Sequence, residues 1–366
     1  MRCWVVAAVA LLAASPGESA WLPTGQTITP LAAPGIQREL LRTGLRADGS
    51  ADAGGAMAVA ISPAGDTLLV LTSGYNYQYY DSRGREIRFP TRNLTTGAIR
   101  RNATDLTQWV FAYRIDGVKL EFLARVSVPN TFDGLAWSPD GSRFYVSGGI
   151  DDCVLVYRRR GAAFAFDAPA IQLGHAGGIL ARTKAGARGA ALGLDFKALA
   201  AGIAVSADGR TLAVANMQND SVSIADTHTR KVIREIPLFV AGSLRAHGEY
   251  PYGVAIASKP GGGVRAIYAS SLRDGDVAEI GVSKSPHFIA LGGEPNALEL
   301  DRDATHLYVA NGDLDEIEVI DTRTNRLKRR ISVDRPHQRC GGANPNALAL
   351  SADGRRLFVS LGGENA

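Results

Sequence analysis

Residues Glu294 to Val333 decide the fold of this chain, and they read EPNALELDRDATHLYVANGDLDEIEVIDTRTNRLKRRISV. Four short runs of apolar and β-branched residues alternate here with turns rich in Gly, Asp and Asn. The runs are Ala297–Leu300, His306–Ala310, Glu316–Ile320 and Arg326–Val333. Such runs between polar turns are typical of short β-strands. Four strands in roughly 40 residues is the repeat length of one β-propeller blade.

The first strand of this unit and the turn after it recur along the chain, which makes this a repeat protein. The six copies are MAVAISPAG (Met57–Gly65), DGLAWSPDG (Asp133–Gly141), AGIAVSADG (Ala201–Gly209), YGVAIASKPGG (Tyr252–Gly262), NALELDRDA (Asn296–Ala304) and NALALSADG (Asn346–Gly354). One blade cannot bury both faces of its small sheet, so neighbouring blades must stack around a ring. The repeats predict an all-β propeller of four-stranded blades. A β-sandwich would not explain six copies of one turn.

These repeats resemble the YVTN-type β-propellers of bacteria, which are relatives of the WD40 propellers. The segments that match the YVTN signature are Tyr308–Asn311 (YVAN), Phe358–Leu361 (FVSL) and Ala213–Asn216 (AVAN). The third strand Val319–Thr324 (VIDTRT) matches as well, and no Trp-Asp dipeptide closes a third strand as in WD40 proteins. The resemblance implies a seven-bladed ring. It leaves the function open, because propellers host many unrelated activities.

The N-terminal residues have the features of an export signal. Arg2 precedes the apolar run Trp4–Ala14, and small residues suited to cleavage follow. A cleaved signal peptide predicts a periplasmic or secreted protein without a membrane span, and an uncleaved anchor is the alternative. Residues 21–35 contain three prolines and show no periodicity. The predicted units are a signal peptide at 1–20, an extended arm at 21–35 and the propeller at 36–366.

Two segments imply a more specific resemblance. Leu71–Asn76 (LTSGYN) and Gly25–Pro30 (GQTITP) are similar to the N-terminal propeller of exported bacterial proteins that also carry a phosphoesterase domain of the alkaline-phosphatase superfamily. The resemblance implies such a C-terminal domain in the full-length protein, outside this chain.

The last repeat shows only two strands, so we expect a propeller that is incomplete at the C-terminus, with about six blades visible. We also expect Gln37–Leu45 to form a strand that fastens the ring.

One repeat position points to the mouth of the central channel, because inner strands line the channel of a propeller. The residues at this position in the six repeats are Met57, Asp133, Ala201, Tyr252, Asn296 and Asn346. A ligand-binding site at this mouth is the prediction. Its candidate residues are Asp133, Tyr252, Asn296, Asn346 and His247, the last in the connection before the fourth inner strand. The alternative is that Asn and Asp at this position only cap backbone groups and shape turns.

The sequence contains no nucleophile elbow, phosphate-binding loop or Rossmann fingerprint, and no close metal-ligand spacing. We therefore expect no catalytic residue, metal or cofactor in this chain. The net charge of +4 is spread over turns and strands, which argues against nucleic acid as a partner.

The main hypothesis is therefore a binding or scaffold domain for an unidentified small molecule or protein at the propeller face. The alternative is a propeller enzyme of the sugar-lactonase kind. Its nearest candidate residues are Asp133, Glu249, Glu294 and His247.

Overall fold

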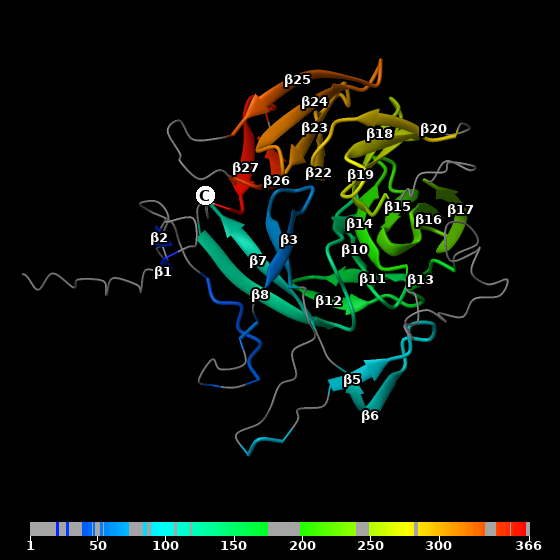
Figure 1. Ribbon diagram of the computed structural model, residues 1–366. Helices are drawn as coiled ribbons and strands as arrows, with labels where there is room; N and C mark the ends of the chain where they lie inside the picture. Colours follow the sequence, from blue (N-terminus) through cyan, green and yellow to red (C-terminus); the bar gives the residue numbers. More distant parts are fainter. Residues whose placement is uncertain are drawn as a thin grey trace, which may run out of the picture.

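The chain folds into small antiparallel sheets that follow one another around a centre, from β3 in blue to β27 in red (Figure 1). This computed structural model describes residues 20–21, 27–28 and 39–363, apart from 46, 48–51, 54, 73–82, 86–88, 106–107, 118, 175–197, 239–248, 282–284, 334–341 and 352. Within these residues the only helix is the short 3-10 turn Met217–Asn219, and no helix has the length and apolar character needed to cross a membrane. The predicted all-β propeller of four-stranded blades is confirmed.

Six sheets are arranged as blades, numbered here 1 to 6 in chain order. Blade 1 consists of β3 (Ala56–Ile61), β4 (Thr67–Thr72), β7 (Gln108–Asp116) and β8 (Lys119–Val128). Blade 2 consists of β9 (Leu135–Trp137), β10 (Arg143–Ser147), β11 (Cys153–Arg160) and β12 (Ala163–Phe166), with β13 (Ile171–Gln172) also paired to β11. Blade 3 consists of β14 (Ala200–Val205), β15 (Thr211–Asn216), β16 (Ser221–Asp226) and β17 (Lys231–Pro237).

The remaining blades continue the same order. Blade 4 consists of β18 (Pro251–Ser258), β19 (Val264–Ser271), β20 (Asp276–Gly281) and β21 (His287–Ala290). Blade 5, the unit with which the sequence analysis began, consists of β22 (Pro295–Leu300), β23 (His306–Asn311), β24 (Glu316–Asp321) and β25 (Arg326–Ser332). Blade 6 consists of β26 (Pro345–Leu350) and β27 (Leu357–Leu361). Two further pairs are β1 (Ala20–Trp21) with β2 (Thr27–Ile28), and β5 (Phe89–Arg92) with β6 (Ile99–Asp105).

The repeated Ser-containing turn between the first two strands is held by its own hydroxyl group. Ser62 Oγ accepts a hydrogen bond from the backbone N–H of Thr67 at 3.0 Å and donates one to Asp66. The hydroxyls of Ser138, Ser206 and Ser351 accept from the N–H five residues later in the same way. In blade 5 the Asp301 carboxylate takes this role by accepting from Thr305. A short side chain that bonds nearby backbone is what such turns require.

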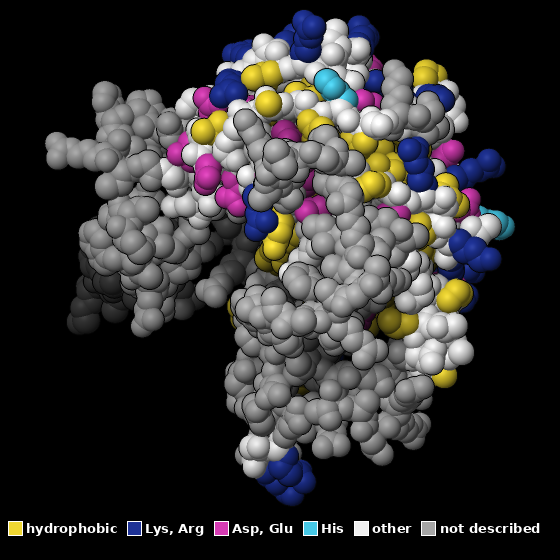
Figure 2. Space-filling model, turned by 45° about the vertical axis from the view of Figure 1, so that its right-hand side comes forward, with side chains coloured by type: hydrophobic (Ala, Val, Ile, Leu, Met, Phe, Trp, Pro, Cys, Tyr) yellow, Lys and Arg dark blue, Asp and Glu magenta, His cyan; other side chains and the backbone are white. Residues whose placement is uncertain are grey.

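The hydrophobic core lies between the blades, because alternate residues of each strand face opposite neighbours. On β10, Phe144 and Val146 pack towards blade 1, whereas Tyr145 packs towards blade 3. Similar buried clusters join blade 3 to blade 4 and blade 4 to blade 5. The polar outer strands face solvent: Lys and Arg side chains gather over β25 at the top of Figure 2.

The predicted strand at Gln37–Leu45 is wrong for the part that the structure describes, since residues 39–45 form no strand. The backbone N–H of Leu45 bonds to the Thr43 hydroxyl at 3.2 Å, and the N–H of Arg42 bonds to the Leu40 carbonyl. These local bonds turn the chain back on itself. Leu41 and Leu45 then pack against the outer part of blade 1.

Neighbouring inner strands approach so closely that three blades need glycine at the point of contact. A Cβ on Gly134, Gly202 or Gly253 would lie well inside van der Waals contact of a backbone carbonyl oxygen of the next blade. These oxygens belong to Ala201, Tyr252 and Asn296, respectively. Backbone cannot move aside as a flexible side chain can, so the three glycines set the spacing of the ring.

We predict that Gly202→Ala destabilises the fold by about 1–3 kcal/mol, the usual cost of overpacking. The added methyl group would meet the carbonyl of Tyr252. Urea unfolding of both proteins measures the effect. Gly263→Ala is the matched control, because a Cβ there has no neighbour within 4 Å. Equal unfolding midpoints for Gly202→Ala and the unchanged protein would contradict this account of the ring.

Candidate functional site

A cavity of about 470 Å³ opens where the inner strands converge, with residues from all six blades in its wall. Most of the wall is backbone and small or aliphatic side chains. The polar side chains that line it are Asp133, Tyr252, Asn346 and Ser360. Among the described residues of the wall, Asp133 is the one ionisable carboxylate. The chemistry of the cavity therefore depends on a small number of groups.

Bulges at the start of the inner strands position the predicted site residues. In five blades the strand register shifts at this position, leaving Met57, Ala201, Tyr252, Asn296 and Asn346 outside the regular ladder. A bulge leaves one residue unpaired and changes the direction of its side chain. In blade 2 the corresponding residue, Asp133, precedes β9, and Ser147 Oγ accepts from the N–H of Gly134 at 2.9 Å.

Asp133 and Tyr252 form a polar pair across the cavity mouth. The Tyr252 hydroxyl donates a hydrogen bond to the Asp133 carboxylate. The two residues belong to blades 2 and 4, and blade 3 between them has the small Ala201 at the same repeat position. Phe132 contacts the Tyr252 ring edge to face, with centroids 6.0 Å apart. The aromatic contact orients the phenol towards the carboxylate.

The protein environment changes the proton affinity of both groups. Burial raises the pKa of Asp133 to about 6, although the Tyr252 hydrogen bond lowers it in part. Burial and the neighbouring Asp133 charge raise the pKa of Tyr252 above its ordinary value. At neutral pH the pair is therefore a carboxylate beside a neutral phenol. A carboxylate with a pKa near 6 is suited to general base catalysis.

The two predicted asparagines have mainly structural roles. Asn296 Nδ2 donates to the Pro345 carbonyl at 3.1 Å, which joins blade 5 to blade 6, and its Oδ1 accepts from Ala297. Asn346 lines the cavity, but its Oδ1 accepts from Ser360 at 2.7 Å. These bonds agree with the alternative that Asn at this position shapes the turn. His247 lies outside the described residues.

Two other candidates for a lactonase site, Glu249 and Glu294, do not line the cavity. Glu249 is buried, and burial followed by the nearby Asp276 charge raises its pKa to about 8. The backbone N–H of Glu294 bonds to Asn311 at 2.9 Å, and burial followed by the charge of Asp313 raises the pKa of its side chain. Of the three described residues weighed for that activity, only Asp133 lines the cavity.

The sequence analysis missed Phe132 and Ser360, which hold Tyr252 and Asn346 in place. The residue before each repeat position varies among the blades, so no pattern pointed to Phe132. The glycines Gly134, Gly202 and Gly253 also line the cavity. They occupy one repeat position. Their recurrence in the sequence could have predicted that the backbones of neighbouring blades approach closely there.

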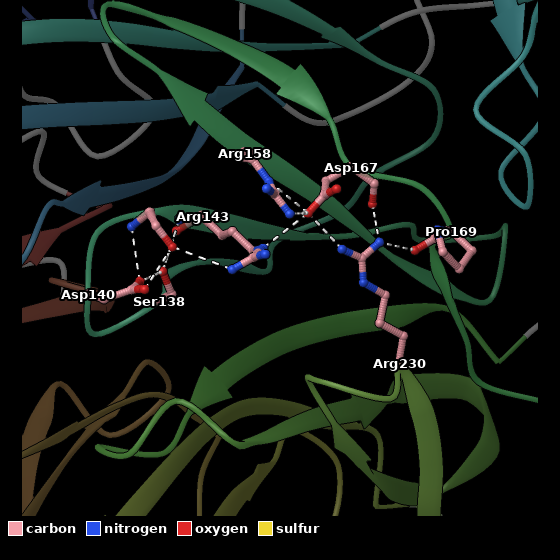
Figure 3. Close-up of polar contacts among 8 residues, drawn as sticks. Ser138, Asp140, Arg143, Arg158, Asp167, Pro169 and Arg230 are labelled. Atoms are coloured by element: carbon pink, nitrogen blue, oxygen red, sulfur yellow. Dashed lines mark hydrogen bonds and ion pairs between the residues drawn. The ribbon is translucent and has the colours of Figure 1, made fainter.

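A second cavity, of about 280 Å³, lies between blades 2 and 3 at the opposite ends of the inner strands. Its wall contains Arg143 and Arg230, and both guanidinium groups bind Asp167, at 3.0 Å and 2.7 Å (Figure 3). Arg158 binds the same Asp167 oxygen at 3.1 Å. Arg230 also donates to the Asp167 and Pro169 carbonyls. Arg230 thereby joins blade 3 to blade 2, whereas Arg143 and Arg158 bind Asp167 within blade 2, so this cavity is a structural junction.

Among the described residues, no three His, Cys, Asp or Glu side chains gather closely enough to hold a metal ion. The histidines His175 and His337 lie, like His247, outside the described part of the chain.

Similar solved structures are β-propellers, including those of lactonases and a lyase. A periplasmic gluconolactonase from Pseudomonas aeruginosa is 16% identical with a TM-score of 0.54, over 96% of this chain and 87% of that one. A catalytically inactive virginiamycin B lyase from Staphylococcus aureus, bound to quinupristin, is 14% identical with a TM-score of 0.53, over 84% and 78%. A 6-phosphogluconolactonase, so designated provisionally, from Bacteroides fragilis is 12% identical with a TM-score of 0.53, over 84% and 78%. No protein-family profile and no curated protein matches the sequence. At these identities the likeness establishes the fold.

We predict that Asp167→Asn lowers the free energy of unfolding at pH 7 by about 2 kcal/mol, because charged hydrogen bonds to the arginines are lost. Burial raises the pKa of Asp167, but the contacts with Arg143, Arg230 and Arg158 outweigh this and leave it below 3.8. A lowered pKa stabilises the fold above the unfolded-state value, and this contribution disappears as the pH falls through the native value.

The stability difference between Asp167→Asn and the unchanged protein should therefore shrink below about pH 4. Urea unfolding from pH 7 to pH 3 measures it. Asp303→Asn removes an exposed turn carboxylate and serves as the control. A difference that stayed constant over this range would contradict the proposed role of Asp167.

Proposed function

We propose that the channel mouth hydrolyses a small lactone, with Asp133 as the general base. The observation that carries the proposal is the Asp133–Tyr252 pair in the wall of an otherwise mostly apolar cavity. A cavity of about 470 Å³ can hold a sugar-sized molecule. A hydroxylated lactone would offer hydrogen-bonding groups to Asn346 and Ser360 at the same mouth.

The reaction needs one proton acceptor and one proton donor in succession. The Asp133 carboxylate takes a proton from water while the water oxygen attacks the lactone carbonyl carbon. The ring C–O bond then breaks, and the leaving oxygen receives the proton from Asp133. The product is a hydroxy acid, and Asp133 returns to its ionised form. Tyr252 keeps its proton throughout and fixes the orientation of the carboxylate.

The similar solved structures support lactone hydrolysis over the hypothesis of a binding propeller without activity. They include propellers named as lactonases, and the sequence analysis had kept a sugar-lactonase propeller as its alternative. At identities of 16% and 12%, these structures do not indicate which residues of this chain would act in catalysis. The geometry of Asp133 and Tyr252 therefore carries the mechanism.

The other hypothesis is a YVTN-type binding propeller, exported to the periplasm and joined to a phosphoesterase domain in the full-length protein. Export and the phosphoesterase domain remain predictions from the sequence. In this hypothesis the same cavity binds a ligand without turnover. Both hypotheses require a ligand at the mouth, and turnover distinguishes between them.

We predict measurable hydrolysis of gluconolactone above the spontaneous rate, and a loss of about 100-fold or more in kcat/KM for Asp133→Asn, the usual contribution of a general base. The base must be ionised, so kcat/KM should fall as the pH drops below about 6. The hydrogen bond from Tyr252 lowers the pKa of Asp133. Removing it in Tyr252→Phe should therefore move this acid limb to higher pH.

Initial rates followed with a pH indicator at several pH values provide the measurement. The variant Asp353→Asn, in the exposed turn of blade 6, is the control and should keep the profile of the unchanged protein. If the lactone binds but no enzyme-dependent turnover occurs, the binding hypothesis takes the place of the enzymatic one. Full turnover in Asp133→Asn would exclude Asp133 as the base.

A further inference from the structure

The cavity between blades 2 and 3 is open at a place that another pair of blades fills. Every residue of its wall is described, and the wall comes from the first turn of each blade, from β10 and from the Thr227–Arg230 turn of blade 3. Asp167, which binds the arginines, is not part of the wall. The volume of about 280 Å³ suits a small ligand.

The junction between blades 4 and 5 shows what can occupy such a place. Tyr268 in blade 4 corresponds to Tyr145 in blade 2, because each lies two residues before a serine that accepts from the inner-strand glycine, at 2.8 and 2.9 Å. The Tyr268 hydroxyl donates to the Thr322 carbonyl of blade 5 at 3.4 Å. Arg265 donates to the same carbonyl at 3.1 Å and to that of Ala304 at 2.6 Å. The chain therefore fills this junction with its own guanidinium group.

Blade 3 has the equivalent carbonyl groups, but no arginine occupies that place. Thr227 corresponds to Thr322, and Gly209 to Ala304, because the threonine hydroxyl donates to the second carbonyl in both blades. Among the described residues, no guanidinium group bonds to either of these two carbonyls of blade 3. Arg143 of blade 2 binds Asp167 instead. The place of the Arg265 guanidinium group is thus left open here.

The cavity presents hydrogen-bond donors and acceptors together. Arg143 and Arg230 supply donors: beyond their bonds to Asp167 and its neighbours (Figure 3), Nη2 of Arg143 and Nε of Arg230 bond to no described residue. Asp140 and Asp208 supply carboxylate acceptors. Two arginines against two aspartates leave the wall with little net charge, so a doubly charged anion would meet repulsion as well as attraction.

We propose that this cavity binds the anion of a small hydroxylated carboxylic acid. Its carboxylate accepts from Arg143 and Arg230, since planar guanidinium groups match two carboxylate oxygens. Its hydroxyl groups donate to the carboxylates of Asp140 and Asp208 and to the Thr227 carbonyl, the counterpart of an acceptor that Arg265 uses in blade 5.

The proposal is independent of the proposed lactone hydrolysis. A hydroxy acid is also the class of product that this hydrolysis would release, but binding between blades 2 and 3 requires neither turnover nor the channel mouth. Binding here and turnover at the mouth can therefore fail separately.

Gluconate is the probe, because it carries one carboxylate and a chain of hydroxyl groups. Calorimetry measures its binding to the intact chain, and NMR spectra of the backbone amides locate it. We expect saturable binding with shifts of the Gly209 and Thr227 amides. Glucose, which lacks the carboxylate, and acetate, which lacks the hydroxyl groups, should both bind about tenfold more weakly or worse, since each loses one set of contacts.

Arg143→Gln should weaken gluconate binding about tenfold or more, the usual effect of losing a hydrogen bond between charged groups. Arg158→Gln is the matched control, because it also removes a contact with Asp167 but does not change the cavity wall. It should keep the affinity of the unchanged protein. Asp133→Asn alters only the channel mouth and should leave the shifts of Gly209 and Thr227 as they are.

Three results would overturn the proposal. One is the absence of saturable shifts at Gly209 and Thr227 when gluconate is added to the unchanged protein. The second is an equal loss of affinity in Arg158→Gln and Arg143→Gln, which would assign the effect to the contacts of Asp167 and not to the cavity. The third is glucose binding as tight as that of gluconate, which would mean that no carboxylate is recognised.

Discussion

The close approach of neighbouring inner strands is the constraint on which the rest of the structure depends. Gly134, Gly202 and Gly253 allow the backbone of one blade to touch a carbonyl oxygen of the next. This spacing lets the alternating apolar residues of adjacent blades form a continuous core. It also leaves much of the channel wall to backbone and small or aliphatic side chains, so that its polar side chains are few: Asp133, Tyr252, Asn346 and Ser360. A larger residue at these glycines would change both the packing and the site.

The same constraint explains why a carboxylate and a phenol from different blades meet. Ala201 in blade 3 is too small to fill the mouth between Asp133 and Tyr252, and Gly202 keeps the blades close. Tyr252 therefore reaches across one blade to Asp133. Because the pair lies in a mostly apolar wall, desolvation outweighs the hydrogen bond and raises the pKa of Asp133 to about 6. Ring geometry thus determines the acid–base property on which the proposed hydrolysis depends.

The sequence was most informative where a short-range physical rule applies. The Ser-containing turns predicted the blades because a hydroxyl at that position bonds backbone five residues later, as at Ser62 and Thr67. The repeat position also brought Asp133, Tyr252 and Asn346 to one cavity. It could not show that Asn296 would use its amide to join two blades. The strand expected at Gln37–Leu45 was wrong for residues 39–45, because local bonds at Thr43 turn the chain.

The central claim is that the wall of the channel mouth gives Asp133 a raised pKa under the control of Tyr252. An NMR titration of the Asp133 carboxyl carbon in the intact chain measures this directly, with Tyr252→Phe as the comparison and Asp133→Asn for assignment. The account predicts a midpoint of about 6, and a higher midpoint in Tyr252→Phe, because that substitution removes the hydrogen bond to the carboxylate. A midpoint near the ordinary value of 3.8 that does not respond to Tyr252→Phe would contradict it.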